Sequence, residues 1–349
     1  MTLYIQILTA FLLSMLLVYI LIPAIVRLSI AKKLFDIPNA RRVNKTVVPN
    51  LGGIALFAGI SIATLLCIQN MVFVDFRYIL VAMIMMFYTG LKDDILMITA
   101  KKKFIVQLLS AIILIILGDI RITNLHGVFG INEIKYIYSF ILSLLAIVAI
   151  INSINLIDGI DGLAAGLGLF ISVFFGSTFF MDGHYQYAIL SFSITGSLIM
   201  FLFFNVFGKT NKIFMGDTGS LLLGVLFSVM AIKYNEFSIT STNFLYAPAL
   251  SLAVISVPLF DMVRVFCVRL FNRRSPFKAD MIHIHHKLLR LGFSHMKSST
   301  IIILLNLFIV CLIYLLRDLD IHFLVVLIVL LEIFFTMLAD ITLSLRGKK

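Results

Sequence analysis

The chain has 349 residues, of which 61% are hydrophobic and 13% charged, and its mean hydropathy is +1.11. Soluble domains contain about 45–50% apolar and about 25% charged residues, so this composition excludes a soluble globular protein and indicates an integral membrane protein. The net charge of +11 does not indicate nucleic-acid binding, because no basic run interleaved with aromatic residues lies clear of the apolar segments. Three cysteines lie in separate apolar segments, without the spacing of a disulfide framework or a metal site.

Apolar segments that are long enough, or nearly long enough, to cross a bilayer recur along the whole chain. A hydrocarbon core needs roughly 20 apolar residues per helix, and no alternation typical of a membrane barrel runs through these segments. In chain order the segments cover residues 3–25, 51–69, 77–91, 104–118, 136–152, 163–181, 186–204, 218–233, 245–267, 299–316 and 321–344. Since several are short, the sequence predicts one all-α membrane domain, residues 1–349, with about 10–11 transmembrane helices.

The lysine and arginine residues predict the orientation of this bundle. If the N-terminus lies outside, only five of the 28 basic residues fall in outer loops: Arg77, Arg121, Lys135, Lys233 and Arg317. The excess of basic residues on the other side places the C-terminus in the cytoplasm. The cytoplasmic loops then cover residues 26–50, 92–103, 152–162, 205–217 and 268–298.

Aspartates gather at the cytoplasmic ends of the apolar segments. Asp93 and Asp94 follow the third segment, Asp158 and Asp161 follow the fifth, and Asp217 opens the eighth. A charge that enters hydrocarbon costs several kcal/mol, so carboxylates at this boundary indicate a binding site. Magnesium takes one or two protein carboxylates and keeps waters and substrate phosphates as its other ligands. These positions therefore predict Mg²⁺ at the cytoplasmic membrane surface.

Groups that suit phosphate accompany the aspartates. The sequence GDTGS at 216–220 opens a helix with glycines and hydroxyls, so that backbone N–H groups are available to an anion. Lys45 and the lysines at 101–103 add positive charge on the same side. A metal and cations that bring two anionic reactants together are typical of phosphoryl transfer.

Each feature also has a structural explanation. An aspartate at the start of a loop is usually a helix cap or turn former, and a lysine run is usually a topology anchor. His283, His285 and His286 have no nearby cysteine and no glutamate between them, which disfavours a zinc site. Asp261 and Arg264, three residues apart inside an apolar segment, are expected to form an ion pair that faces the bundle interior.

A transporter of lipid-linked sugars is the main alternative from another class. Such a protein carries ionisable or broken-helix sites near the midplane of several helices, with repeat symmetry between its halves. Here only Asp261 and Arg264 lie well inside a segment, so an enzyme is favoured.

Seven segments, in this order along the chain, resemble the polyprenyl-phosphate N-acetylhexosamine-1-phosphate transferase family, glycosyltransferase family 4. They are DIPNARRVNKTVVPNLGG (36–53), GLKDD (90–94), KFIVQ (103–107), NSINLIDGIDGLAAG (152–166), FMGDTGSLLLG (214–224), PLFDMVRV (258–265) and RSPFKADMIHIHHKLLRLGFSH (274–295). The resemblance implies transfer of a sugar 1-phosphate from a UDP-sugar to a polyprenyl phosphate with release of UMP. It also implies a multi-pass protein of the bacterial inner membrane, where such lipid-linked sugars begin cell-surface polysaccharides.

The resemblance implies a role for each candidate site residue. Asp217, with Asp158, would bind Mg²⁺, with Mn²⁺ as the other candidate metal. Asp93 and Asp94 would act at the acceptor phosphate, and Asn155, Asp158 and Asp161 around the uridine and the metal-bound phosphates. Lys45 and Lys103 would meet phosphate, and His283, His285 and His286 would donate hydrogen bonds to the nucleotide-sugar.

The form of the histidine segment indicates the branch of the family. HIHHKLLRLG, with RSPFKAD before it, resembles the branch that uses simple UDP-N-acetylhexosamines, as in O-antigen, lipopolysaccharide and teichoic acid initiation. UDP-N-acetylglucosamine is the expected donor and undecaprenyl phosphate the expected acceptor. The phospho-N-acetylmuramyl-pentapeptide transferases of peptidoglycan synthesis remain the alternative within the family, and a homodimer remains open.

Overall fold

The structure is a computed structural model that describes residues 3–34, 48–68, 73–239, 246–273 and 282–346. In these ranges it contains helices and no β-strand, apart from an isolated bridge between Asn124 and Glu133. The helices are α1 (Leu3–Ala31), α2 (Gly52–Cys67), α3 (Val74–Leu96), α4 (Ala100–Ile116), η1 (Val128–Gly130), α5 (Tyr136–Ile157), α6 (Leu163–Met181), α7 (Tyr185–Leu202), η2 (Phe203–Phe207), α8 (Gly216–Ser238), α9 (Ala247–Phe271), α10 (Ile284–Arg290), α11 (His295–Leu315) and α12 (Ile321–Arg346).

The predicted all-α membrane bundle is confirmed. The described part of every predicted apolar segment overlaps a helix, and nine of the described helices are long and apolar enough to cross a membrane. The apolar α2 has only 16 residues. The short α10 was not predicted as a span, because its sequence, IHHKLLR, is largely polar.

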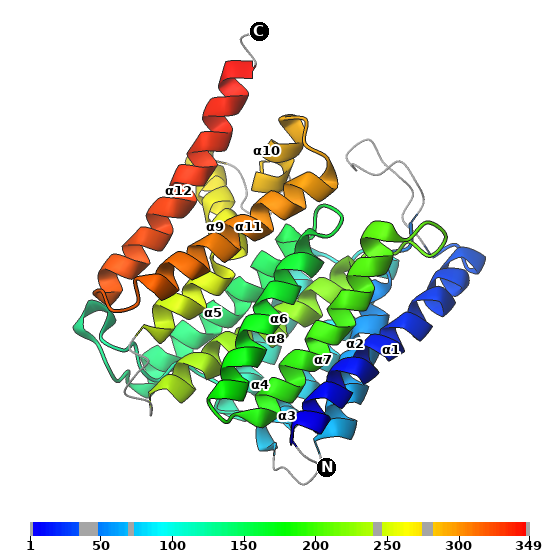
Figure 1. Cartoon of the computed structure of the whole chain (residues 1–349), viewed down its shortest axis with the longest axis horizontal. Coiled ribbons are helices and arrows are strands. Elements are labelled where there is room, and N and C mark those ends of the chain that lie inside the picture. Colours follow the sequence, from blue (N-terminus) through cyan, green and yellow to red (C-terminus); the bar gives the residue numbers. More distant parts are fainter. Residues whose placement is uncertain (1–2, 35–47, 69–72, 240–245, 274–281, 347–349) are drawn as a thin grey trace.

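Successive helices run in opposite directions, so alternate helix ends gather at one end of the bundle (Figure 1). At this end, called the site end from here on, α3 and α5 end and α4, α6 and α8 begin. The short helix α10 lies at the same end, at the top of Figure 1. Asp93, Asp94, Asp158, Asp161 and Asp217 therefore lie on one side of the bundle, as their positions in the sequence predicted.

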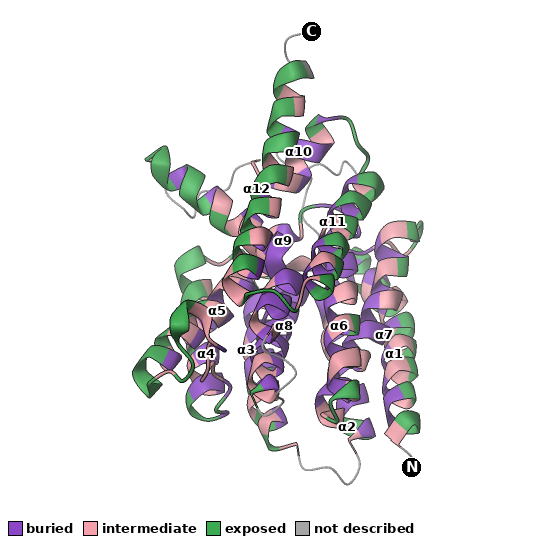
Figure 2. Ribbon diagram, turned by 60° about the vertical axis from the view of Figure 1, so that its left-hand side comes forward, coloured by how far each residue is buried: buried purple, intermediate pink, exposed green. Residues whose placement is uncertain are grey.

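Helix α8 lies at the centre of the bundle and α12 at its edge. In the most apolar window of α8, 83% of residues are buried, against 17% in α12, and Figure 2 shows the same contrast. Helix α8 packs against α2, α3, α5, α6 and α9. Because neighbours on all sides hold α8, its first turn has a fixed position from which Asp217 can act.

A buried asparagine connects two loops at the site end. Helix α7 continues into the π-helical turn η2, and single π turns of this kind are common at functional sites. Asn205 in this turn accepts a hydrogen bond from Gly162 N at 2.8 Å and donates one to Ile213 O at 2.9 Å. The loop that follows α5 and the loop that precedes α8 are thereby held together.

Candidate active site

Side chains from four helices lie together around Asp217. Its Oδ2 atom accepts a hydrogen bond from Lys103 Nζ at 2.5 Å, and its Oδ1 atom accepts one from Asn155 Nδ2 at 2.6 Å. Lys103 Nζ also lies 2.6 Å from Asp93 Oδ2, and Asn155 Nδ2 lies 2.8 Å from Ser220 Oγ. The predicted residues of α3, α4, α5 and α8 are thus brought together, and Lys103 is part of the site.

Asp94 caps α8 from the end of the neighbouring helix α3. Its Oδ1 atom accepts from Asp217 N at 2.9 Å and from Asn50 Nδ2 at 3.3 Å. Its Oδ2 atom accepts from Thr218 N at 2.9 Å and from Thr218 Oγ1 at 2.5 Å. A carboxylate has about four lone-pair sites, and a negative charge is favourable at a helix N-terminus. Asp94 therefore fixes the start of α8, and with it the backbone of Asp217.

A glycine lets α3 approach α8 closely enough for this cap. A Cβ atom at Gly90 would lie 2.4 Å from Thr218 Cα and 2.6 Å from the carbonyl carbon of Asp217. Both are backbone atoms of the first turn of α8, so they cannot rotate away. The glycine of GLKDD is therefore required by the contact between the two helices.

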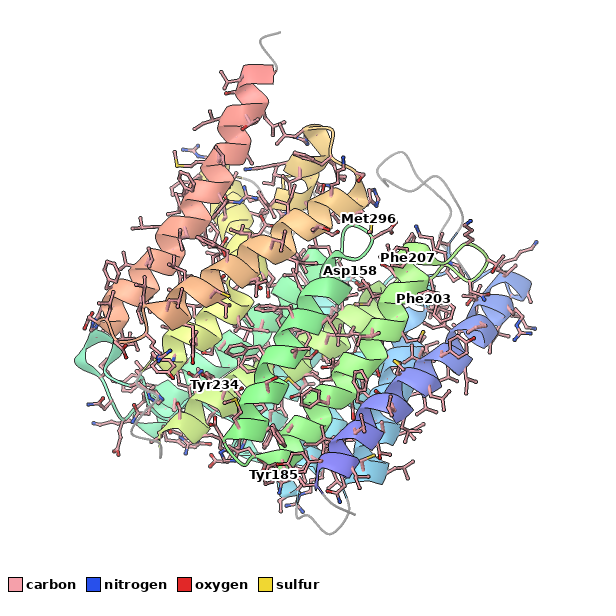
Figure 3. The ribbon with its side chains drawn as sticks, viewed as in Figure 1. Asp158, Tyr185, Phe203, Phe207, Tyr234 and Met296 are labelled. Carbon is pink, nitrogen blue, oxygen red and sulfur yellow. The ribbon has the colours of Figure 1, made fainter. Side chains whose placement is uncertain are left out.

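Asp158 and Asp161 have opposite electrostatic surroundings although they share one loop. Burial, together with the negative charges of Asp217, Asp94 and Asp161, raises the pKa of Asp158 to about 7. Asp158 has no hydrogen-bond partner among the described residues. Burial also acts on Asp161, but hydrogen bonds to His295 and Lys212 lower its pKa below the usual value. Asp158, which Figure 3 labels at the site end, thus lacks the positive partners that Asp161 has.

Asp217 and Asp158 offer oxygen donors for a divalent cation. Within the described part of the chain, no three His, Cys, Asp or Glu side chains gather into a self-sufficient metal site. Magnesium does not require one, because it takes one or two carboxylates together with waters and substrate phosphates. The donor set and the uncompensated negative charge at Asp158 therefore fit Mg²⁺.

The histidine segment contacts the Asp158 loop. A Cβ atom at Gly159 would lie 2.2 Å from His285 Nε2, so the glycine makes room for this ring. His283 and His285 are buried, with 5% and 1% of their surface exposed, whereas His286 is half-buried. Burial and the neighbouring His286 lower the pKa of His285 to about 3, so this ring is neutral. The most accessible of the three histidines is thus His286.

The structure adds residues that the sequence did not single out for the site. Lys212 Nζ lies 2.7 Å from Asp161 Oδ2, and His295 Nδ1 lies 3.5 Å from the same atom. Asn50 comes shortly before two glycines within residues 36–53, one of the segments that resemble the family. This position is a signal that could have identified it. Lys45 lies outside the described residues.

The arrangement suits an anionic substrate with more than one phosphate. Lys103 is held between two carboxylates, and a polar helix start lies beside it. Two carboxylates share this single ammonium group, so a metal cation bound beside them and the phosphates of a substrate would neutralise each other there.

Comparisons with known proteins agree with this chemistry. A model of glycosyl transferase family 4 matches residues 76–235. The probable undecaprenyl-phosphate N-acetylglucosaminyl 1-phosphate transferase of Bacillus subtilis (strain 168) is 32% identical over 341 residues, which cover 97% of this chain and 92% of that protein. The undecaprenyl-phosphate alpha-N-acetylglucosaminyl 1-phosphate transferase of Escherichia coli (strain K12) is 30% identical over 280 residues, covering 79% and 75%. The protein of the same description from Yersinia pestis is 29% identical over 297 residues, covering 82% and 80%.

Proposed function

Because this chain belongs to glycosyl transferase family 4, among the undecaprenyl-phosphate N-acetylglucosaminyl 1-phosphate transferases, we propose that it takes its sugar phosphate from a UDP-N-acetylhexosamine. The chain transfers N-acetylglucosamine 1-phosphate to undecaprenyl phosphate, and the expected donor is UDP-N-acetylglucosamine. The observation that carries the proposal is the contact of Asp217 with Lys103 and Asn155 at the start of α8. It places a carboxylate, an ammonium group and a helix N-terminus at one point.

The proposed reaction is a single in-line displacement. A phosphate oxygen of undecaprenyl phosphate attacks the phosphorus next to the sugar in the UDP-sugar. The bond from that phosphorus to the oxygen that bridges to UMP breaks, and UMP leaves with the bond electrons. The products are undecaprenyl diphosphate-linked sugar and UMP, so no covalent enzyme intermediate is needed.

The site residues position and neutralise the two reactants. Lys103 presents one ammonium group to phosphate while Asp93 and Asp217 fix its location. Asp93 orients the acceptor phosphate through this lysine, and Asp94 acts by fixing the start of α8. Holding two reactants in a reactive geometry accounts for a large part of the acceleration in such transfers.

A second group of residues is proposed to bind the donor. Asn155, Asp158 and Asp161 surround the uridine and its phosphates, and the histidine segment meets the phosphates and the sugar. Asp217 and Asp158 would hold Mg²⁺, which supplies positive charge to neutralise the phosphates as the bond to UMP breaks.

The proposed location of the site is the cytoplasmic face of the bacterial inner membrane. The sequence assigns 23 of the 28 lysine and arginine residues to the same side of the membrane as the aspartates, and the positive-inside rule places that side in the cytoplasm. UDP-sugars are soluble and anionic, so a site at a polar membrane surface suits both them and a lipid acceptor.

A donor panel tests the proposal directly. Detergent-purified full-length protein is incubated with undecaprenyl phosphate and sugar-labelled UDP-N-acetylglucosamine, UDP-N-acetylgalactosamine or UDP-N-acetylmuramyl-pentapeptide, with Mg²⁺ or with chelator. The proposal predicts Mg²⁺-dependent lipid-linked label and one equivalent of UMP with UDP-N-acetylglucosamine. Transfer from the muramyl donor alone would instead assign the chain to peptidoglycan synthesis, and no transfer from any donor would contradict the proposed reaction.

A further inference from the structure

Asp261 and Arg264 of α9 hold the segment that carries the histidines. Asp261 is almost fully buried, with 4% of its surface exposed. Its Oδ1 atom accepts from Arg264 Nη2 at 2.7 Å and from Ile284 N at 3.0 Å, and its Oδ2 atom lies 2.8 Å from His283 Nδ1. Arg264 Nη2 also donates to Ile282 O at 2.7 Å. The predicted ion pair of Asp261 and Arg264 thus forms hydrogen bonds with the backbone and with a side chain at the start of α10.

This contact determines which nitrogen of His283 carries a proton. Carboxylate oxygens only accept hydrogen bonds, so Nδ1 of His283 is the donor and Nε2 is the atom available to another partner. A carboxylate behind a histidine fixes both its tautomer and its ring orientation. Asp261 and His283 are both buried, so bulk water cannot replace the contact.

Contacts between histidine rings connect His283 to the Asp158 loop of the site. The ring of His283 lies 5.7 Å from that of His285 with only 9° between their planes, and His285 lies 4.2 Å from His286. His285 in turn abuts Gly159, which follows Asp158 directly. A displaced His283 would therefore displace the whole histidine segment relative to the Asp158 loop.

We propose that Asp261 is a positioning residue for the nucleotide-sugar, and that it acts through His283 with Arg264 as its partner. The role rests on the proposed transfer from a UDP-sugar, because the histidine segment is the part of the site assigned to that substrate. Asp261 should therefore affect the donor and leave the lipid acceptor unaffected.

The test is a double-variant cycle on the full-length protein in detergent. Asp261→Asn removes the carboxylate, and His283→Asn keeps an amide donor near the place of Nδ1 while removing Nε2. KM for UDP-N-acetylglucosamine should rise about 10- to 100-fold in each single variant, the range typical when the partner that orients a metal-ligating histidine is removed. KM for undecaprenyl phosphate should stay unchanged, and the double variant should resemble the more affected single variant.

Three outcomes would overturn the positioning role: single-variant effects that multiply in the double variant, equal rises in both KM values, or an unchanged donor KM in Asp261→Asn. If Asp261→Asn yields no folded protein, His283→Gln is the second variant. It removes the hydrogen bond between His283 and Asp261 by changing the histidine, and it keeps an amide near the place of Nε2. It should raise the donor KM selectively, and a wild-type donor KM in that variant would also overturn the role.

Asp340→Asn is the matched control. Asp340 lies on α12, is 56% exposed at its side chain and pairs with Lys287 of α10 at 2.7 Å, so the variant removes one exposed ion pair of α10 without touching a histidine or its partners. Both KM values should stay at wild-type levels. Failure of the proposed function is seen separately, as absence of transfer by the wild-type protein, whereas an active wild type with an unchanged donor KM in Asp261→Asn refutes only the positioning role.

Discussion

Gly90→Ala is expected to disable the site by adding one methyl group between α3 and α8. The new Cβ would lie 2.4 Å from Thr218 Cα, 2.5 Å from Thr218 N and 2.6 Å from the carbonyl carbon of Asp217. Ordinary van der Waals contact begins at 3.4 Å, so the two helix backbones must separate by about 1 Å. The glycine itself bears no reactive group, so any loss of activity reports on geometry alone.

The separation acts on both stability and rate. The two hydrogen bonds from the α8 backbone to Asp94 are now 2.9 Å long, and about 1 Å more takes them out of hydrogen-bonding range. Overpacking of this kind costs roughly 1–3 kcal/mol of stability. A displacement of about 1 Å in a catalytic site lowers the rate by about 100-fold, which is the expected fall in kcat.

The assay compares initial rates of lipid-linked product formation, together with thermal unfolding in detergent, for the wild type and two variants. Gly168→Ala is the control, because the atoms nearest to a Cβ there belong to the side-chain ends of Leu198 and Phe227, both at 3.1 Å. Its kcat should stay within about twofold of wild type, since those atoms need to move only a few tenths of an ångström. A wild-type kcat in folded Gly90→Ala would refute the requirement for close contact between α3 and α8.

Three further predictions concern single side chains of the site. Asp217→Asn should insert into the membrane normally but lose at least about 100-fold in turnover, because it removes the charge that holds Lys103 and that we propose binds Mg²⁺; substantial activity would refute the proposed role as metal ligand. Asp158→Asn should stabilise the protein in chelator at pH 8 by on the order of 1–2 kcal/mol, measured as a rise in Tm. Burial raises the folded-state pKa of Asp158 from 3.8 to about 7, so wild-type stability falls as pH rises through this interval, and the gain should shrink at pH 5; a gain that does not depend on pH would contradict the assignment. His295→Ala should lower turnover by less than about threefold, because Asp161 keeps its ion pair with Lys212 at 2.7 Å; complete loss of turnover would show that His295 contacts substrate.

The sequence was sufficient to predict the helices and the side of the bundle on which the candidate site lies. Long apolar runs leave no other spanning structure, and alternating chain direction necessarily gathers Asp93, Asp158 and Asp217 at one end. The pairing of Asp261 with Arg264 was also predictable, because residues three apart share a helix face. These features depend on local periodicity, which the sequence displays directly.

Contacts between distant segments could not be predicted in the same way. Asp94 caps a helix that begins 122 residues later in the chain, at Gly216, and nothing in GLKDD distinguishes it from its neighbour Asp93. The hydrogen bond from His283 to Asp261 likewise depends on how α9 and α10 pack. Adjacent residues on a helix face different directions, so Asp93 and Asp94 reach different partners, and only packing decides which.

The phosphate next to the sugar shows directly which bond of the donor breaks. UDP-N-acetylglucosamine carrying ³²P only at that position is incubated with the purified protein, undecaprenyl phosphate and Mg²⁺, and the lipid and aqueous products are separated. Transfer of sugar 1-phosphate predicts that the label enters the lipid fraction and that the released nucleotide is unlabelled UMP. Label recovered in aqueous UDP, with sugar on the lipid, would show transfer of the sugar alone and contradict the assigned reaction.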